Sequence, residues 1–487
     1  MHIAPVPIPR HRRAAGAASP PLRPVPSVRR PLCLRPLACL ALLTVAACGR
    51  PDAPAAAAPP LASHPDWARD AVIYEVNIRQ FTPEGTFRAL LPHLARLDDL
   101  GVDILWLMPV QPIGVDRRKG TLGSYYSIAD YRATNPEFGT LADLKAVVDS
   151  AHALGLKVIL DWVANHSAHD HPWTAAHPDW YVHRADGSIS NALDRDGRET
   201  DWTDVAELDY ANPAMRAAMI DEMRYWLTDV GMDGFRCDVA WGVPLDFWLE
   251  ARQALVATRP DLFLLAEEED AKLHAAFDAT YGWGFHHLLN AIAQGKEPAA
   301  KLDEYLAGSS AFPANAMRLY FTSNHDENSW QGTEFERMGE NHQPAFVLAA
   351  TMAQSFPLLY TGQEARLAKR LRFFEKDSVT WGDTTLVPFY RALFRAKAEV
   401  PALANGAGGA QAKLAGTGPA DVYAFTRTAG ESHLVVAVNF GDAPARFAYT
   451  GLAAPGEYRD VFGGAARPLA AAGTLELPAH GWLVLAR

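Results

Sequence analysis

Short apolar runs alternate with helical patterns from residue 71 onward, and this alternation most narrows what the chain can fold into. The runs are rich in Val, Ile, Leu, Phe and Tyr with little polar alternation, which is typical of strands buried on both faces of a parallel sheet. Eight strands are predicted, at residues 72–76, 103–108, 157–162, 234–238, 262–266, 276–280, 318–322 and 357–360. Eight strand–helix units predict an α/β fold, a (β/α)8 TIM barrel over residues 66–397.

Two regions depart from this rhythm. About 70 residues separate the third strand from the fourth, and the polar, Asp- and His-rich stretch at about 167–210 predicts a small excursion domain. After residue 398, Gly- and Ala-rich turns separate short alternating segments at 422–426, 434–439, 475–477 and 482–485. This pattern predicts a C-terminal antiparallel β-sandwich domain over residues 398–487.

The N-terminus has the layout of an export signal. Residues 1–47 contain seven Arg and no Asp or Glu, and an apolar run ends at Ala46-Ala47 just before Cys48. A Cys after small residues resembles a bacterial lipoprotein signal, so we expect a signal peptide at 1–47, lipidation of Cys48 and a flexible linker at 48–65. The expected location is the bacterial envelope, at the outer membrane because Gly49 follows Cys48. Without the lipid, the protein would be periplasmic or secreted.

Charge and cysteine content exclude two classes of protein. The formal net charge of −11 argues against a nucleic-acid partner. Four Cys in 487 residues exclude a disulfide-dense scaffold. The sequence does not predict the oligomeric state.

Charged residues stand at the ends of four predicted strands. The third strand ends with Asp161 and is followed by His166, and the fourth ends with Arg236 and Asp238. The fifth is followed by Glu267, and the seventh by His325-Asp326. Because TIM barrels place their active sites at the carboxyl ends of the strands, we expect these side chains to meet there. A solvated loop explains one such carboxylate, but not the whole set.

Several carboxylates at one site are what glycoside hydrolysis requires. Asp238 is the predicted nucleophile, because Arg236 lies two residues earlier on the same side of the strand and favours its ionised form. Glu267 is the predicted general acid, since burial and nearby acidic groups raise a carboxyl pKa. Strand alternation alone does not distinguish Glu267 from Glu269. Asp326 is expected to stabilise positive charge in the transition state, and His166 and His325 to donate hydrogen bonds to sugar hydroxyls.

Four motifs in this order resemble the α-amylase family of retaining glycoside hydrolases: Asp161-Trp162-Val163-Ala164-Asn165-His166, Gly234-Phe235-Arg236-Cys237-Asp238, Leu264-Leu265-Ala266-Glu267 and Phe321-Thr322-Ser323-Asn324-His325-Asp326. The resemblance covers about residues 68–395. It implies that Asp238 is the nucleophile, Glu267 the acid/base and Asp326 the transition-state stabiliser. It also implies that Arg236 supports Asp238, that His166 and His325 contact the bound sugar and that Tyr126 stacks on it. Asp161 is counted with the substrate-binding residues.

One departure from the family concerns calcium. Trp241 and Gly242 stand where many members carry Lys-His, and that His helps to bind a structural calcium. Asn165 still matches another calcium position of the family, and Asp201, Asp204 and Asp209 offer oxygen ligands. The chemistry itself requires no cofactor, and a structural calcium stays open.

The resemblance implies hydrolysis of α-1,4-glucosidic bonds in starch-like glucans or malto-oligosaccharides, with retention at the anomeric carbon. One alternative is a related transglycosylase or isomerase that converts trehalose or maltose. A second alternative is a surface glucan-binding protein without catalysis, but such members lack the catalytic carboxylates that this chain keeps.

Overall fold

The computed structural model describes residues 62–487. The predicted signal peptide, the lipidation site Cys48 and nearly all of the predicted linker lie outside the described residues. Among residues 62–487, no helix has both the length and the apolar character to span a membrane.

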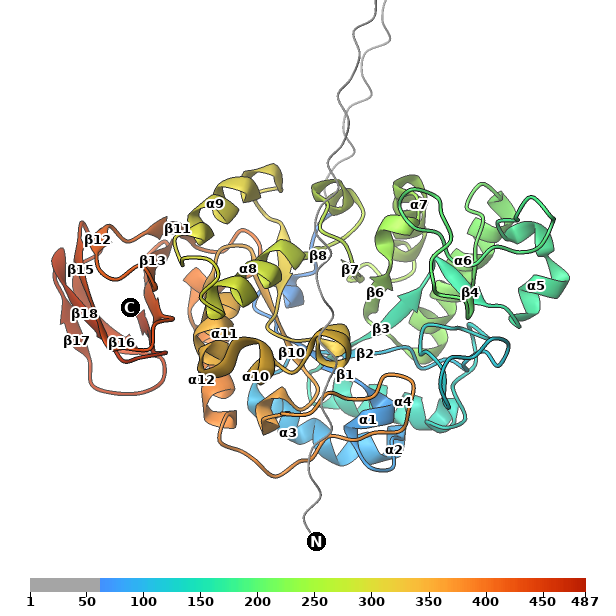
Figure 1. The fold of residues 1–487 in the computed structure, drawn as a ribbon, viewed down its shortest axis with the longest axis horizontal. Coiled ribbons are helices and arrows are strands. Elements are labelled where there is room, and N and C mark those ends of the chain that lie inside the picture. Colours follow the sequence, from blue (N-terminus) through green and yellow to red (C-terminus); the bar gives the residue numbers. More distant parts are fainter. Residues whose placement is uncertain (1–61) are drawn as a thin grey trace, which may run out of the picture. The chain divides into compact units, whose positions relative to one another are not determined.

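Eight parallel strands close into a barrel in the order β1-β10-β9-β8-β7-β6-β3-β2 (Figure 1). Their bounds are β1 Ile73–Val76, β2 Ile104–Leu107, β3 Lys157–Val163, β6 Gly234–Asp238, β7 Phe263–Ala266, β8 Ala279–Tyr281, β9 Met317–Tyr320 and β10 Ser355–Tyr360. Each overlaps one of the eight predicted runs, so the predicted TIM barrel is confirmed.

Both faces of each strand are buried, which explains why the strands show so little polar alternation. In β2, Ile104 and Trp106 join the cluster that fills the barrel interior, while Leu105 and Leu107 join the layer packed with the helices. In β7, Phe263 and Leu265 point inward and Leu264 points outward. Side chains fill the barrel, so chemistry is confined to its rim.

Helices surround the barrel: α1 Ile78–Phe81, α2 Phe87–Leu90, α3 Leu94–Leu100, α4 Leu141–Ala153, α6 Pro213–Tyr225, α7 Leu245–Val256, α8 Trp283–Ala293, α9 Lys301–Gly308, α10 Glu334–Met338, α11 His342–Thr351 and α12 Val387–Glu399. Local signals set their ends. Asn212 caps α6 and Pro213 occupies its first turn. The π-helical turn Trp226–Val230 continues α6 and ends at Gly231, whose φ of 92° suits glycine. A 3-10 helix, Ala271–Ala275, connects β7 to β8 in place of an α-helix.

The long connection between β3 and β6 holds a small antiparallel pair. Strand β4, His166–Ala168, pairs with β5, Val205–Glu207, and the short helix α5, Pro172–Ala176, lies between them in the sequence. This is the region predicted as an excursion domain.

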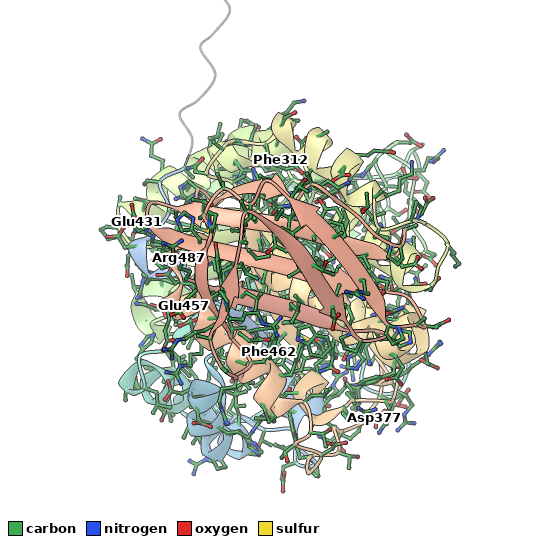
Figure 2. All side chains as sticks on the ribbon, turned by 90° about the vertical axis from the view of Figure 1, so that its left-hand side faces the viewer. Phe312, Asp377, Glu431, Glu457, Phe462 and Arg487 are labelled. Atoms are coloured by element: carbon green, nitrogen blue, oxygen red, sulfur yellow. The ribbon has the colours of Figure 1, made fainter. Side chains whose placement is uncertain are left out.

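The C-terminal domain consists of two antiparallel sheets (Figure 2). One has the order β11-β13-β14-β19-β16-β17 and the other β12-β15-β18. The bounds are β11 Ala410–Lys413, β12 Gly416–Thr417, β13 Val422–Ala429, β14 Ser432–Asn439, β15 Ala445–Thr450, β16 Gly456–Asp460, β17 Arg467–Leu469, β18 Ala472–Leu477 and β19 Trp482–Ala486. Residues of both sheets share one core, among them Val435, Phe447 and Leu475. The predicted sandwich is confirmed, although the sequence indicated only four of its strands.

Candidate active site

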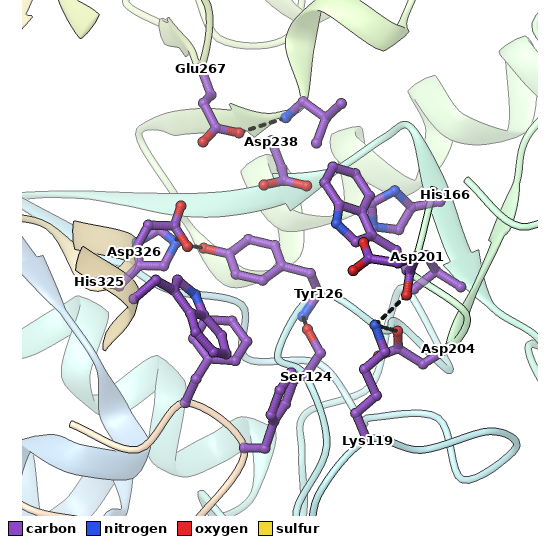
Figure 3. Close-up of a pocket in the computed structure, with 16 residues that line it drawn as sticks. Lys119, Ser124, Tyr126, His166, Asp201, Asp204, Asp238, Glu267, His325 and Asp326 are labelled. Atoms are coloured by element: carbon purple, nitrogen blue, oxygen red, sulfur yellow. Dashed lines mark hydrogen bonds and ion pairs between the residues drawn. The ribbon is translucent and has the colours of Figure 1, made fainter. Parts of the chain in front are cut away.

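A cavity of about 450 Å³ opens at the carboxyl ends of the barrel strands (Figure 3). Six of the predicted site residues line it: Tyr126, His166, Asp238, Glu267, His325 and Asp326. Asp161 and Arg236 are fully buried and act on the cavity through the residues that they contact. All eight predicted side chains are therefore brought to one place.

Arg236 is the electrostatic centre of the site. Its Nη1 donates hydrogen bonds to Asp161 Oδ1 and to Asp238 Oδ1, each at 2.8 Å. Its Nη2 forms an ion pair with Glu267 Oε1, also at 2.8 Å. One buried guanidinium thus contacts three carboxyl groups, and it holds Asp238 and Glu267 close to each other.

Glu267 retains a proton near neutral pH. Burial, with the charges of Asp238 and Asp326, raises its pKa to about 8, although Arg236 acts in the opposite direction. Its Oε2 accepts a hydrogen bond from the backbone N–H of Val239 at 2.9 Å (Figure 3). Val239 has a φ of 45°, a left-handed conformation that is rare for a β-branched residue. The turn directly after Asp238 therefore also positions Glu267.

His325 is held in its charged form. Burial lowers its pKa, but the charges of Asp326 and Glu75 together raise the pKa to about 9. Its Nδ1 donates to Glu75 Oε1 at 2.5 Å, and its Nε2 lies 3.4 Å from Asp326 Oδ2. Asp326 is the most open of the three predicted catalytic carboxylates, with 37% of its side chain exposed. A charged His325 is a hydrogen-bond donor at both ring nitrogens.

Tyr126 forms one wall of the cavity and is linked to the charged network. Its hydroxyl donates to Asp161 Oδ2 at 3.1 Å and lies 2.8 Å from His325 Nε2. The indole N–H of Trp106 also donates to Asp161 Oδ2, at 3.1 Å. The ring of Tyr126 is thereby fixed by its hydroxyl in the network, and it also stacks on the rings of His325 and Phe373, with centroid distances of 5.5 and 6.3 Å.

The residues around Asn165 do not form an oxygen cage for calcium. The Asn165 amide Nδ2 donates to Glu207 Oε2 at 3.0 Å, and Asp204 faces the ammonium group of Lys119 at 3.4 Å. Asn165 Oδ1 is buried without a hydrogen-bond partner, but a Cβ added at Gly242 would approach it to 2.1 Å, so backbone already occupies that side. Among residues 62–487, no three His, Cys, Asp or Glu side chains converge as metal ligands.

The sequence reasoning missed several residues of the site. Glu75 lies within β1, where one acid among apolar residues was the available signal. The other residues that line the cavity carry no periodic pattern and were not predicted; among them are Lys119, Ser124, Trp202, Val205, Trp330, Phe373 and Phe374.

Three carboxyl groups meet around one cavity at the strand ends of the barrel. This arrangement is typical of enzymes that cleave glycosidic bonds with paired carboxyl groups. The family model of the alpha amylase catalytic domain matches residues 63–385, and that of the alpha amylase C-terminal all-beta domain matches residues 417–485. The chain belongs to the alpha-amylase family.

Individual relatives carry more than one activity in their names. The chain is 31% identical over 400 residues to alpha-amylase MalA of Haloarcula japonica, a match that covers 78% of this chain and 57% of that protein. It is 35% identical over 213 residues to the trehalose synthase of a Pimelobacter species, covering 37% and 35%. The chain thus spans less than two thirds of the length of these curated relatives. Among solved structures, an alpha-amylase from Lactobacillus plantarum is 33% identical with a TM-score of 0.76, covering 86% of this chain and 99% of that one.

Proposed function

We propose that the protein hydrolyses α-1,4-glucosidic bonds in starch-like glucans or malto-oligosaccharides, with retention at the anomeric carbon. The observation that carries the proposal is the single guanidinium of Arg236, which contacts both Asp238 and Glu267 at 2.8 Å. Retaining glycosidases need their two carboxyl groups close together, about 5–5.5 Å apart, so that one can attack the sugar directly.

In the proposed first step, Asp238 Oδ attacks the anomeric carbon while Glu267 gives its proton to the departing glycosidic oxygen. The raised pKa of Glu267, about 8, supports this role because the group is protonated at neutral pH. The ionic contact with Arg236 supports the charged form of Asp238. The result is a glycosyl ester on Asp238 and a free leaving sugar.

In the second step, Glu267, now ionised, takes a proton from a water molecule that attacks the same carbon. The ester bond breaks, Asp238 regains its charge, and Glu267 regains its proton. Two inversions give net retention. The charged His325 is positioned to donate hydrogen bonds to sugar hydroxyls, and the open carboxylate of Asp326 is positioned to stabilise the positive transition state.

The second candidate is transfer to a sugar instead of water, as in a trehalose- or maltose-converting enzyme. The similarity to a trehalose synthase favours keeping this candidate. Both reactions use the same glycosyl ester and differ only in the acceptor.

Incubation with maltose, maltotriose, soluble starch, pullulan and sucrose, followed by NMR of the first product, tests the proposal. Hydrolysis with retention gives the α-anomer first and no longer or rearranged sugars. Trehalose or longer oligosaccharides would favour the second candidate. A β-anomer as first product, or no reaction with any of these sugars, would contradict the proposal.

We also propose that the protein acts outside the cytoplasm, anchored to the envelope by a lipid on Cys48. The basic and apolar character of residues 1–47 supports this. Metabolic labelling with a fatty acid tests it: the label should appear in the full chain and disappear in Cys48→Ser.

A further inference from the structure

We propose that residues 117–123, called here the bridging loop, close one end of the active-site cavity, so that the enzyme accepts short malto-oligosaccharides and free chain ends but not the interior of long glucans. This inference rests on the proposed function and names its substrate class.

On one side, the bridging loop is tied to the excursion domain. Lys119 Nζ donates to the backbone oxygen of Asp201 at 2.7 Å and lies 3.4 Å from Asp204 Oδ1. Arg117 Nη1 reaches Asn191 Oδ1 at 3.4 Å. Two cationic side chains of this loop thus contact three residues of the excursion domain.

On its other side, the bridging loop is tied to the segment after β10. The backbone N–H of Leu122 donates to the carbonyl of Phe374 at 2.9 Å, and that of Thr121 donates to Glu375 Oε1 at 2.9 Å. At Gly120, whose φ is +62°, an added Cβ would come within 2.4 Å of Phe374 Cβ. The two segments are therefore in direct contact, and this turn requires glycine.

The buried side chain of Arg79 stabilises the contact between the bridging loop and the segment after β10. Its Nη1 donates to the carbonyls of Gly123 at 3.0 Å and of Phe373 at 3.4 Å. Its Nη2 donates to the carbonyl of Leu122 at 3.2 Å. One guanidinium thus binds carbonyls of both segments, which makes the junction part of the folded structure and not a loose meeting of surface loops.

The joined segments form a wall of the cavity itself. Lys119, Asp204 and Phe374, one from each of the three segments, all line the cavity. Figure 3 shows Lys119 and Ser124 on the opposite side of Tyr126 from Glu267. Because Glu267 protonates the departing sugar, the reducing-end part of the substrate lies on its side. The wall therefore faces the non-reducing end and limits how far the chain can continue there.

The test uses 4-nitrophenyl α-maltotrioside with its non-reducing end either free or capped by a 4,6-ethylidene group, with products separated by chromatography. We expect kcat/KM to be at least about tenfold higher for the free substrate, because the cap must enter the space that the wall occupies. Equal kcat/KM for the two substrates would contradict the inference that the wall blocks the non-reducing end, and would leave the proposed function intact. If neither substrate is cleaved, the proposed function fails and this inference with it.

Lys119→Ala removes the contacts of the wall with Asp201 and Asp204 and should lower the free-to-capped ratio several-fold. It should also raise release of dye from cross-linked starch, where only internal bonds are accessible. Lys145→Ala is the matched control, because Lys145 Nζ donates to the backbone oxygen of Asp229 at 2.6 Å from exposed surface outside the cavity. Phe374→Ala weakens the other junction. A ratio unchanged in both Lys119→Ala and Phe374→Ala, with unfolding temperatures near that of the parent, would overturn the assignment of the wall.

Discussion

The two ends of the barrel use the same residue type in opposite ways. At the amino ends of the strands, Asp103, Asp233 and Asp278 each stand directly before a strand. Each accepts a backbone N–H from the neighbouring strand region at 2.8 Å, from Val72, Val158 and Leu264 respectively. The recurrence of this contact joins adjacent strands at the end of the barrel remote from the cavity.

The two ends of the barrel also differ in the number of basic partners that an acidic side chain has. At the amino end, Asp233 alone has three basic partners: His152 at 2.7 Å, Arg259 at 2.5 Å and Lys157 at 3.4 Å. Burial raises its pKa, but the contact with His152, the hydrogen bond from the backbone N–H of Val158 and the charge of Arg259 outweigh burial and hold the pKa below the usual value. At the carboxyl end, three carboxylates share Arg236. Several basic partners keep the pKa of Asp233 low, whereas the shared guanidinium of Arg236 leaves Glu267 with a raised pKa and a proton to give.

The sharpest test of this contrast is Asp238→Asn. Loss of the nucleophile should lower kcat on maltotriose by about 10⁴-fold or more, while the fold stays intact because the amide can still contact Arg236. Turnover and the unfolding temperature are measured together. Asp442→Asn, at an exposed position of the C-terminal domain, is the control and should leave both unchanged. Turnover near the parent value in Asp238→Asn would remove this residue from the mechanism.

Glu267→Gln should lower kcat on maltotriose by about 10³-fold, because general acid catalysis is lost. In the parent, activity should fall as pH rises through about 8, since the acid loses its proton there. A 2,4-dinitrophenyl glycoside needs no proton on its leaving group, so its first-step burst should be far less sensitive to the substitution. A variant equally impaired on both substrates would argue against an acid role.

Asp233→Asn should spare catalysis and lower stability. Removing the charge weakens the contacts of a fully buried carboxylate with three partly exposed basic side chains, which costs about 1.5–3 kcal/mol. Because the pKa of Asp233 is lowered on folding, its contribution is complete above the unfolded value near 3.9 and disappears as pH falls through the folded value. Urea unfolding should therefore separate parent and variant at pH 7 and bring them together in acid. Equal urea midpoints at pH 7 would contradict the contrast between the two ends.

The smallest effect is expected for Glu75→Gln. The glutamine cannot support the charge on His325, so the pKa of His325 should fall and kcat/KM should drop by about tenfold. The titration profile of the His325 imidazole, followed by NMR, should move to lower pH, which a purely structural role would not produce. Glu304→Gln, on exposed helix surface, is the control. An unchanged profile would show that Glu75 only packs against His325.

The barrel was predictable because its signal is local and repeated. Runs buried on both faces stand out whatever their partners, as β2 and β7 show. The sandwich was harder to predict, because β11 is largely exposed and β15 alternates buried residues, such as Phe447 and Tyr449, with exposed ones. Neither has the continuous apolar run that marked the barrel strands.

The site was predictable where position along a strand determines position in space. Asp238 and Glu267 stand at the ends of β6 and β7, and the carboxyl ends of parallel strands meet at one rim. Lys119 and Phe374 could not be placed in this way, because their meeting depends on contacts between loops more than 250 residues apart in the sequence. No spacing rule links such positions.

The left-handed turn at Val239 lets the backbone take part in the active site. Its amide delivers a partial positive charge to the Glu267 oxygen, from a residue that contains nothing to titrate. The pH dependence of this protein can therefore be shifted by a substitution at Val239, without a change to any of the acidic residues. A glycine there would make the backbone more flexible and weaken the hydrogen bond to Glu267. The pKa of Glu267 would then change although no charged group had been altered.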